Sequence, residues 1–233
     1  MRRSLVALAV VAVLVMAASA PASAQTWIQL RYWSSPNSAW DIASPSTIVF
    51  SSNLTGFSLR RTLMGGEWAA SLNYDTGAFN TVWATPGQFN RFWNFNLHRN
   101  FTSERGVFSL FAGWGSAAFE WPNFGPPAAY IRQSGFRLGV DAKVNVRDQW
   151  YLTGSAAYGP FGQATESFAY ESTGTFNARV MDWNVGLGRT FGAWGLEGGY
   201  RGISWSHDPS VCLGSPCGVR WGGWYVGLNL TMP

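Results

Sequence analysis

The feature that most restricts the fold of this chain is the alternation of apolar and polar residues along successive short segments. Between Phe136 and Val146 every second residue is apolar, and the intervening positions include Arg137, Asp141 and Lys143. A period of two places the two kinds of side chain on opposite faces of a β-strand. Residues 90–101 follow the same pattern, and the chain is therefore expected to be all-β.

The small number of charged residues indicates that part of the outer surface does not face water. Charged residues make up 12% of the chain and aromatic residues 16%, and Lys143 is the one lysine. Soluble domains usually carry about 25% charged residues, which keep their exteriors hydrated. The formal net charge of +4 is a weak field for a chain of 233 residues, so no nucleic-acid partner is expected.

The first 24 residues have the pattern of a secretory signal peptide. Arg2 and Arg3 are followed by an apolar run from Leu5 to Ala18, and Ala22-Ser23-Ala24 offers small residues at the cleavage positions. An uncleaved anchor helix is the alternative, but the run is shorter than the ~20 residues that span hydrocarbon. Residues 25–233 show no composition break and are expected to form a single domain.

An apolar exterior without membrane helices requires a closed barrel. No segment after residue 24 approaches ~20 continuous apolar residues, and lipid cannot satisfy the free edge of an open sheet. The predicted fold is a closed antiparallel up-and-down transmembrane β-barrel of ten strands, with eight as the alternative if a hairpin is misread. The predicted strands are 26–33, 54–63, 67–75, 91–101, 107–118, 134–146, 149–158, 177–190, 194–205 and 219–231.

The connections between these strands alternate in length. Tight turns are predicted around Gly65-Gly66, Ser103-Glu104, Arg147-Asp148 and Gly192, and loops of about 13–20 residues at the other end. Outer-membrane barrels have this pattern, with their short turns in the periplasm. A soluble lipocalin-like barrel also alternates polar and apolar residues, so a soluble periplasmic ligand-binding barrel remains an alternative.

The last predicted strand carries a resemblance to a known class of protein. Tyr225, Gly227, Leu230 and Met232 resemble the C-terminal assembly signal of bacterial outer-membrane β-barrel proteins, although this chain ends in Thr231-Met232-Pro233 instead of an aromatic residue. The resemblance implies that the mature chain lies in a bacterial outer membrane, with outer-membrane lipids as its partners.

Aromatic residues on the apolar face are predicted to form girdles at the two membrane boundaries, where one edge of a ring meets water. The predicted girdle residues are Trp68, Tyr74, Phe108, Trp114, Trp150, Tyr158, Trp194 and Tyr200. Arg61, Arg99 and Arg189 fall on the same face just before short turns, where their long side chains can reach lipid phosphates.

Charged residues on the polar face are predicted to meet inside the barrel. These lumen residues are Arg60, Glu67, His98, Arg137, Asp141, Lys143, Asp182, Glu197 and Arg201. Apart from His98 the two signs balance, which favours a plug of ion pairs, since unpaired buried charges are prohibitively costly. A narrow pore between the pairs is the alternative, although selective pores usually have one sign in excess.

The predicted external loops are aromatic and weakly charged. Their contact candidates are Trp40, Trp83, Trp121 and Phe124, and Phe119 and Tyr130 lie in the same regions. The rings could close the barrel mouth or form an exposed patch for a surface partner, a glycan or a like subunit. Cys212 and Cys217 lie in the last loop, and export to an oxidising compartment predicts a disulfide between them.

The sequence offers no evident catalytic set, metal site or cofactor motif. Of its two histidines, His98 is expected near the periplasmic end as a hydrogen-bond partner in the lumen. Ser206-His207-Asp208 are adjacent in the chain, and adjacent residues rarely converge on one reacting atom. The predicted function is therefore a non-enzymatic barrel with a structural or surface-interaction role. A small pore and an outer-membrane lipid- or peptide-modifying enzyme are the alternatives.

Overall fold

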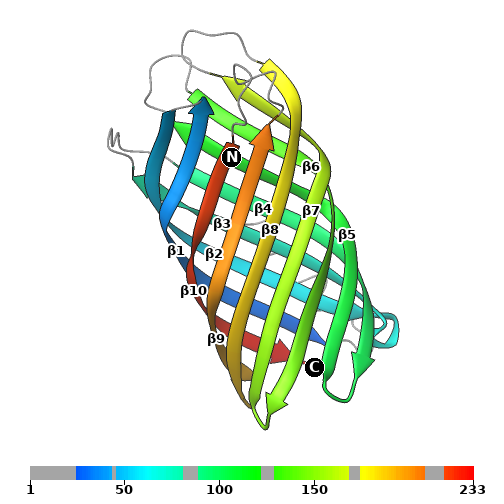
Figure 1. Cartoon of the computed structure of the whole chain (residues 1–233). Helices are drawn as coiled ribbons and strands as arrows, with labels where there is room; N and C mark the ends of the chain where they lie inside the picture. Colours follow the sequence, from blue (N-terminus) through cyan, green and yellow to red (C-terminus); the bar gives the residue numbers. More distant parts are fainter. Residues whose placement is uncertain (1–24, 44–45, 81–88, 122–128, 168–173, 208–217) are drawn as a thin grey trace.

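The computed structural model describes residues 25–43, 46–80, 89–121, 129–167, 174–207 and 218–233. In this part of the chain ten antiparallel strands form one closed barrel, which confirms the predicted fold class (Figure 1). The strands are β1 (Thr26–Ala43), β2 (Ser46–Leu63), β3 (Trp68–Asn80), β4 (Phe89–Ser103), β5 (Gly106–Trp121), β6 (Ala129–Arg147), β7 (Trp150–Ser167), β8 (Gly174–Phe191), β9 (Trp194–His207) and β10 (Gly218–Met232).

Every strand pairs with its neighbours in the sequence, and the first strand pairs with the last. In this β1–β10 seam Thr26 lies opposite Met232 and Asp41 opposite Gly218. The seam leaves no open sheet edge along these strands. Closure is what a sheet needs in lipid, where no water can satisfy unpaired backbone groups.

The strands begin and end close to the prediction at the short-turn end and extend beyond it at the other end. The loop expected after residue 33 is wrong, because β1 continues to Ala43 and β2 begins at Ser46. β6 and β7 likewise pair as far as Tyr130 and Ser167. The barrel is therefore taller than the sequence pattern indicates.

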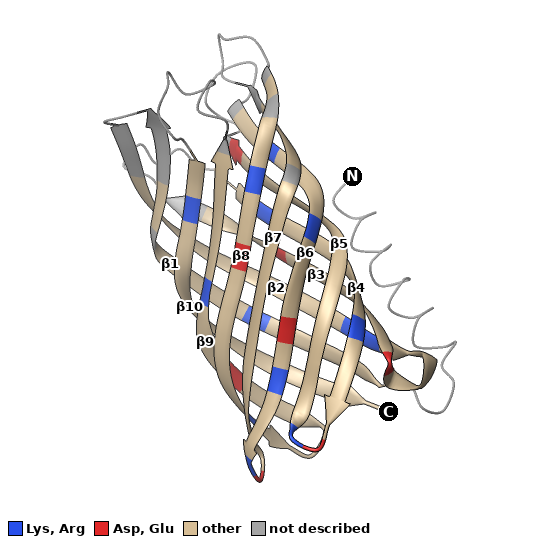
Figure 2. Cartoon of the chain, turned by 45° about the vertical axis from the view of Figure 1, so that its right-hand side comes forward, with Lys and Arg blue, Asp and Glu red and all other residues tan. Residues whose placement is uncertain are grey.

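Two of the turns at the short end have glycine where the backbone enters the left-handed region. A single 3-10 turn, η1 (Met64–Gly66), joins β2 to β3, and Gly65 has a φ of 69°. Gly192, between β8 and β9, has a φ of 66°. Glycine adopts this left-handed region without a steric penalty. Charged residues also gather at several of these turns, at the lower end of the barrel in Figure 2.

The outer face carries a continuous apolar band. Along β6 the outward residues from Phe136 to Val146 are apolar, and Leu138 is 51% exposed. Ten steps along a strand tilted by ~40° climb about 25 Å, the height of the apolar band of an outer-membrane barrel. No helix among the described residues is both long and apolar enough to cross a membrane.

Several predicted features fall outside the described residues. These are the signal peptide at 1–24, the cysteines Cys212 and Cys217, and the loop residues Trp83 and Phe124. Trp40, Trp121 and His207 belong to strands, but their side chains are likewise outside the description.

Candidate functional site: the barrel lumen

A belt of buried ion pairs crosses the middle of the lumen. Arg31 binds Asp75 through two hydrogen bonds of 2.7 Å, and Arg201 reaches the same carboxylate at 2.7 Å. Arg201 also binds Asp182 at 3.1 Å, and Arg137 binds Asp182 at 3.4 Å. The Asp75 side chain is 2% exposed and that of Arg201 is 5% exposed. These residues form the ionic belt, which joins β1, β3, β6, β8 and β9.

The belt extends the predicted set of lumen charges. The sequence pattern predicts Arg137, Asp182 and Arg201 inside the barrel, whereas Arg31 and Asp75 are absent from the predicted set. The alternation does indicate an inward direction for Asp75, because this residue follows Tyr74, which is predicted to face outward. Bidentate arginine–carboxylate pairs of this kind are strong, and they fix the geometry of the groups they join.

Above the belt, toward the ends of the strands without tight turns, the lumen is filled mainly by aromatic and aliphatic side chains, with a few buried polar side chains among them. The ring centres of Phe92 and Trp221 are 5.0 Å apart, and those of Phe92 and Trp205 are 6.2 Å apart. The Arg201 guanidinium lies 5.1 Å from the centre of the Trp33 ring, so the ionic belt contacts these aromatic residues. This aromatic plug corrects the expectation that ion pairs alone fill the interior. Its buried members are Trp33, Phe50, Leu54, Phe92, Ala117, Phe119, Ile131, Ile203, Trp205, Val219 and Trp221.

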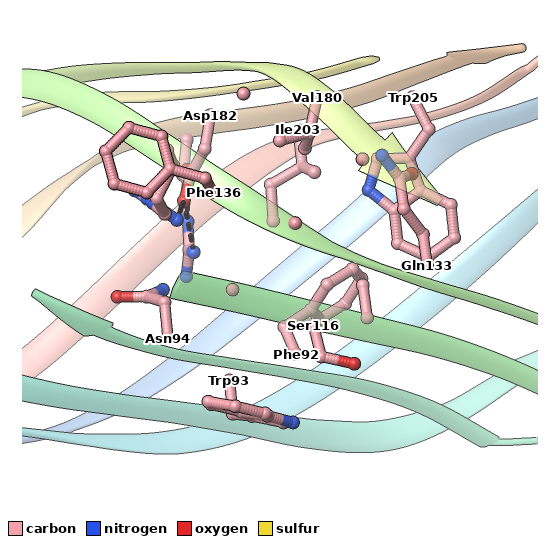
Figure 3. A pocket seen from close by; sticks show the side chains of 17 residues that line it. Phe92, Trp93, Asn94, Ser116, Gln133, Phe136, Val180, Asp182, Ile203 and Trp205 are labelled. Carbon is pink, nitrogen blue, oxygen red and sulfur yellow. Dashed lines mark hydrogen bonds and ion pairs between the residues drawn. The ribbon is translucent and has the colours of Figure 1, made fainter. Parts of the chain in front are cut away.

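A small cavity of about 40 Å³ lies at the boundary between belt and plug. Figure 3 shows Asp182 with its ion pairs on one side, and Trp205, Gln133 and Ile203 farther along. Its size is that of one or two water molecules. The amide oxygen of Gln133 is buried without a partner among the described groups. A water at this position would satisfy it.

The wall beside this cavity is interrupted by a β-bulge in β7. The pairing of β7 with β8 shifts between Gly159 and Gly162 of β7. The pairing of β7 with β6 shifts between Phe136 and Leu138 of β6. The inserted stretch contains Pro160, which has no N–H to give to a neighbouring strand. A bulge bends its strand and re-aims the neighbouring side chains. This one faces Arg137, where the ionic belt meets the wall.

Below the belt, toward the tight turns, the lumen holds a polar cavity of about 580 Å³. It extends to Gln25, Gly66 and Thr231 at the end of the barrel. This periplasm-side cavity, so named for the expected orientation of the short turns, is within the size range of small-molecule sites. Amide side chains line much of its wall: Gln29, Asn73, Asn94, Asn96, Asn100 and Asn184.

Several predicted lumen charges surround this cavity. Arg60 binds Asp141 at 2.5 Å and also donates to Asn100 and Ser109, each at 2.7 Å. Glu197 accepts hydrogen bonds from Tyr225 at 2.7 Å and from Thr153 at 3.2 Å. On another part of the wall, the Lys143 ammonium lies 4.1 Å from the centre of the Tyr151 ring.

His98 is held in the cavity by both of its ring nitrogens. Nδ1 lies 2.9 Å from Oδ2 of Asp141, and Nε2 lies 2.8 Å from Oγ of Ser71. The sequence predicts His98 as a hydrogen-bond partner in the lumen but does not identify Ser71, which lies on the adjacent strand. The signal in the sequence was weak, because Ser71 is one of many serines, and its nearness to His98 depends on the β3–β4 register.

Glu67 is not part of the lumen network. Its side chain is 65% exposed and pairs with Arg99, which lies 5.3 Å from the Trp68 ring. Glu67 precedes β3, so the strand alternation does not fix its direction. It neutralises the outward Arg99 near the short-turn end instead.

The aromatic residues predicted for the girdles lie on outward-facing positions of their strands. Trp114 and Tyr158 are each 48% exposed, and Tyr200 stacks on Trp183 at 5.7 Å. Phe119, expected in an external loop, is instead fully buried in the plug because β5 extends to Trp121.

No protein-family model and no curated protein matches this sequence. Among solved structures, the barrel is similar to the outer membrane protease OmpT from Escherichia coli, with a TM-score of 0.54, 10% identity, and coverage of 91% of this chain and 97% of that one. It also matches Neisserial surface protein A, with a TM-score of 0.37, 11% identity, and coverage of 88% and 96%. A third match is the translocator domain of autotransporter NalP from Neisseria meningitidis, with a TM-score of 0.39, 11% identity, and coverage of 98% and 97%. The likeness to OmpT shows that the chain shares the closed β-barrel fold of that outer-membrane protein.

Proposed function

We propose that this protein is a non-conducting barrel of a bacterial outer membrane, exported by a signal peptide at 1–24. The observation that carries the proposal is the double closure of the lumen by the ionic belt and the aromatic plug. The role that suits such a barrel is structural or surface interaction, and a narrow pore is the competing function.

The membrane location is supported by the distribution of residues on the outer face. Apolar side chains cover the middle of the barrel, and charged groups lie near its ends. Arg132 pairs with Glu120 toward one end, and Arg99 pairs with Glu67 toward the other. Charged side chains cost little near the interfaces and about 2–4 kcal/mol at the midplane. Membrane fractionation tests the location: a barrel in lipid requires detergent for extraction and changes its gel mobility on boiling.

The closed lumen is supported by the packing across the barrel axis. Trp33 and Trp205 are at most 2% exposed, and the carboxylate of Asp75 below them is bound by two arginines. A hydrated path would have to separate these rings and also break buried ion pairs, which is costly.

Planar-bilayer recording distinguishes the closed barrel from a pore. The native protein is expected to give no reproducible single-channel steps. A triple alanine variant at Phe92, Trp205 and Trp221 removes three plug rings and is expected to increase conductance. Alanine at the outward Trp183 and Trp224 is the matched control and leaves conductance unchanged. Stable steps from the native protein would establish the pore instead.

The surface-interaction role is supported by charged and aromatic groups at the far end of the barrel. On the outer face there, Glu120 binds both Arg91 and Arg132, and the Arg132 guanidinium lies 4.6 Å from the Tyr130 ring. The aromatic loop segments around Trp83 and Phe124 follow the adjoining strands. Binding of intact cells to glycan arrays tests this role, with cells expressing W83A/F124A as control. Equal binding by both cell types would count against these loops as the contact.

A further inference from the structure

The periplasm-side cavity contains three side chains in the arrangement of a nucleophile, a base and a carboxylate. Ser71, His98 and Asp141 come from β3, β4 and β6, and their contacts measure 2.8 Å and 2.9 Å. All three line the cavity. We propose that Ser71 is the nucleophile of a hydrolytic site for small carboxylic esters that enter from the short-turn end.

The two ring contacts fix the tautomer that this chemistry needs. An ionised carboxylate can only accept a hydrogen bond, so in the neutral imidazole Nδ1 carries the hydrogen toward Asp141. Nε2 is then an acceptor and receives the Ser71 O–H. This is the order of roles in the serine–histidine–aspartate triad, which is recognised by geometry and not by position in the sequence.

The surrounding residues hold this arrangement in place. Arg60 binds the other oxygen of Asp141 at 2.5 Å, which keeps the carboxylate ionised and oriented. The Phe111 ring lies 5.1 Å from the imidazole of His98 and covers it. Next to Phe111 is Gly139, where a Cβ atom would collide with the ring. The absence of a side chain at Gly139 thus leaves room for Phe111 to pack beside His98.

An amide donor lies beside the nucleophile. The Nδ2 of Asn96 is 3.3 Å from Oγ of Ser71, and it also donates to Asn94 at 2.9 Å. A donor at this position can stabilise the negative oxygen that forms when a carbonyl carbon is attacked. Such donors act strongly where the site excludes bulk water.

The reaction is a two-step hydrolysis through an acyl-serine. Oγ of Ser71 attacks the ester carbonyl carbon and its proton moves to Nε2 of His98. The bond between the carbonyl carbon and the alkoxy oxygen breaks, and His98 gives the same proton to that oxygen, which leaves as the alcohol. Water then attacks the acyl-serine and gives a proton to His98, the carbon–Oγ bond breaks, and Ser71 recovers its proton. The products are a carboxylic acid and an alcohol.

The cavity defines the class of ester. A volume of about 580 Å³ is too small for a lipid with two long acyl chains, and the amide-rich wall suits polar groups. Small or short-chain esters reach Ser71 from the end formed by Gly66, Thr102 and Thr231. The ionic belt and plug block the cavity from the opposite side.

The test uses the full-length mature barrel in detergent micelles and the small serine reagent diisopropyl fluorophosphate. We expect phosphorylation of Ser71, located by peptide mass spectrometry, and hydrolysis of p-nitrophenyl acetate that this labelling abolishes. Both rates rise with pH to a plateau, because only the neutral imidazole of His98 accepts the proton of Ser71. A structural hydrogen bond between Ser71 and His98 would give neither the label nor this profile.

Matched variants separate catalysis from folding. Ser71→Ala and His98→Gln are expected to lower hydrolysis at least hundredfold. Ser155→Ala removes another serine of the same cavity, one bound by Asn184 and not by a histidine, and leaves the rate unchanged. Heat-dependent gel mobility verifies that each barrel is folded. Absence of a label on Ser71 in the folded native protein, or hydrolysis that persists in folded S71A, would overturn the proposal.

Discussion

The two halves of the lumen differ in how their inward side chains are stabilised. Above the ionic belt, aromatic and aliphatic side chains such as Phe92, Trp205 and Trp221 pack closely against one another. Below it, polar groups surround a cavity of about 580 Å³, where water can act as a partner. The same substitution should therefore cost much more in the upper half and in the belt than in the lower half. The free energy of unfolding of each variant, measured with urea on the barrel in lipid vesicles and followed by tryptophan fluorescence, tests this difference.

The largest effect is expected from Arg201→Ala. Arg201 binds both Asp75 and Asp182, so its loss leaves two buried carboxylates with one arginine each. Removing one partner of a buried ion pair costs about 3–5 kcal/mol. Arg132→Ala is the control, because its side chain is 60% exposed and surface pairs contribute about 0–1 kcal/mol. Equal unfolding free energies for the two variants would refute the buried belt.

Ile203→Ala is expected to have the next largest effect. Ile203 is 4% exposed inside the plug, and truncating a buried isoleucine costs about 2–5 kcal/mol. Met64→Ala is the control, because this side chain is 77% exposed in the turn η1, outside the apolar band, and a much smaller loss is expected. If Met64→Ala proved the more costly change, the dry upper lumen would be contradicted.

A smaller loss is expected from Gly139→Ala. The new Cβ would collide with the Phe111 ring and with the backbone oxygen of Ala156, and overpacking of this kind costs about 1–3 kcal/mol. The control is Gly154→Ala, whose nearest neighbouring atom would lie 3.8 Å away. An unchanged unfolding free energy for G139A would mean that Phe111 has room to move and is not fixed beside His98.

The smallest effect is expected from Asn184→Ala in the lower half. Its hydrogen bond to Ser155, 2.7 Å long, lies at the cavity, where water can replace the lost group. The expected cost is about 0.5–1.5 kcal/mol. A loss as large as that of Arg201→Ala would show that the lower half is as dry as the upper half, and the contrast between the halves would disappear.

The sequence predicted the barrel well because alternation is a local property. The ten strands and the positions of the tight turns follow from residues a few places apart, such as Phe136 to Val146 and the glycines at 65–66 and 192. The end of β5 was missed because the polarity of its two faces reverses there. Phe119 points inward into the plug while the adjoining Glu120 points outward, so the segment resembles an aromatic loop.

The candidate site could be predicted only in part, because its contacts depend on distances across the barrel. The inward direction of His98 and Asp141 follows from their strands, but their contact requires knowing how β4 and β6 are staggered on either side of β5. Arg31 reaches Asp75 over 44 positions in the sequence, although β1 and β3 are separated by one strand. The shear and closure of the barrel determine these pairs, and neither is encoded in any single segment.

The β1–β10 seam has a consequence for how the chain matures. Thr26 and Met232 are partners although 206 positions separate them in the sequence, so the seam forms only when two distant segments meet. Folding dominated by such distant partners is slow. Until β1 and β10 have met, both strands have open edges that can pair with other chains, so the unclosed sheet must be protected from aggregation.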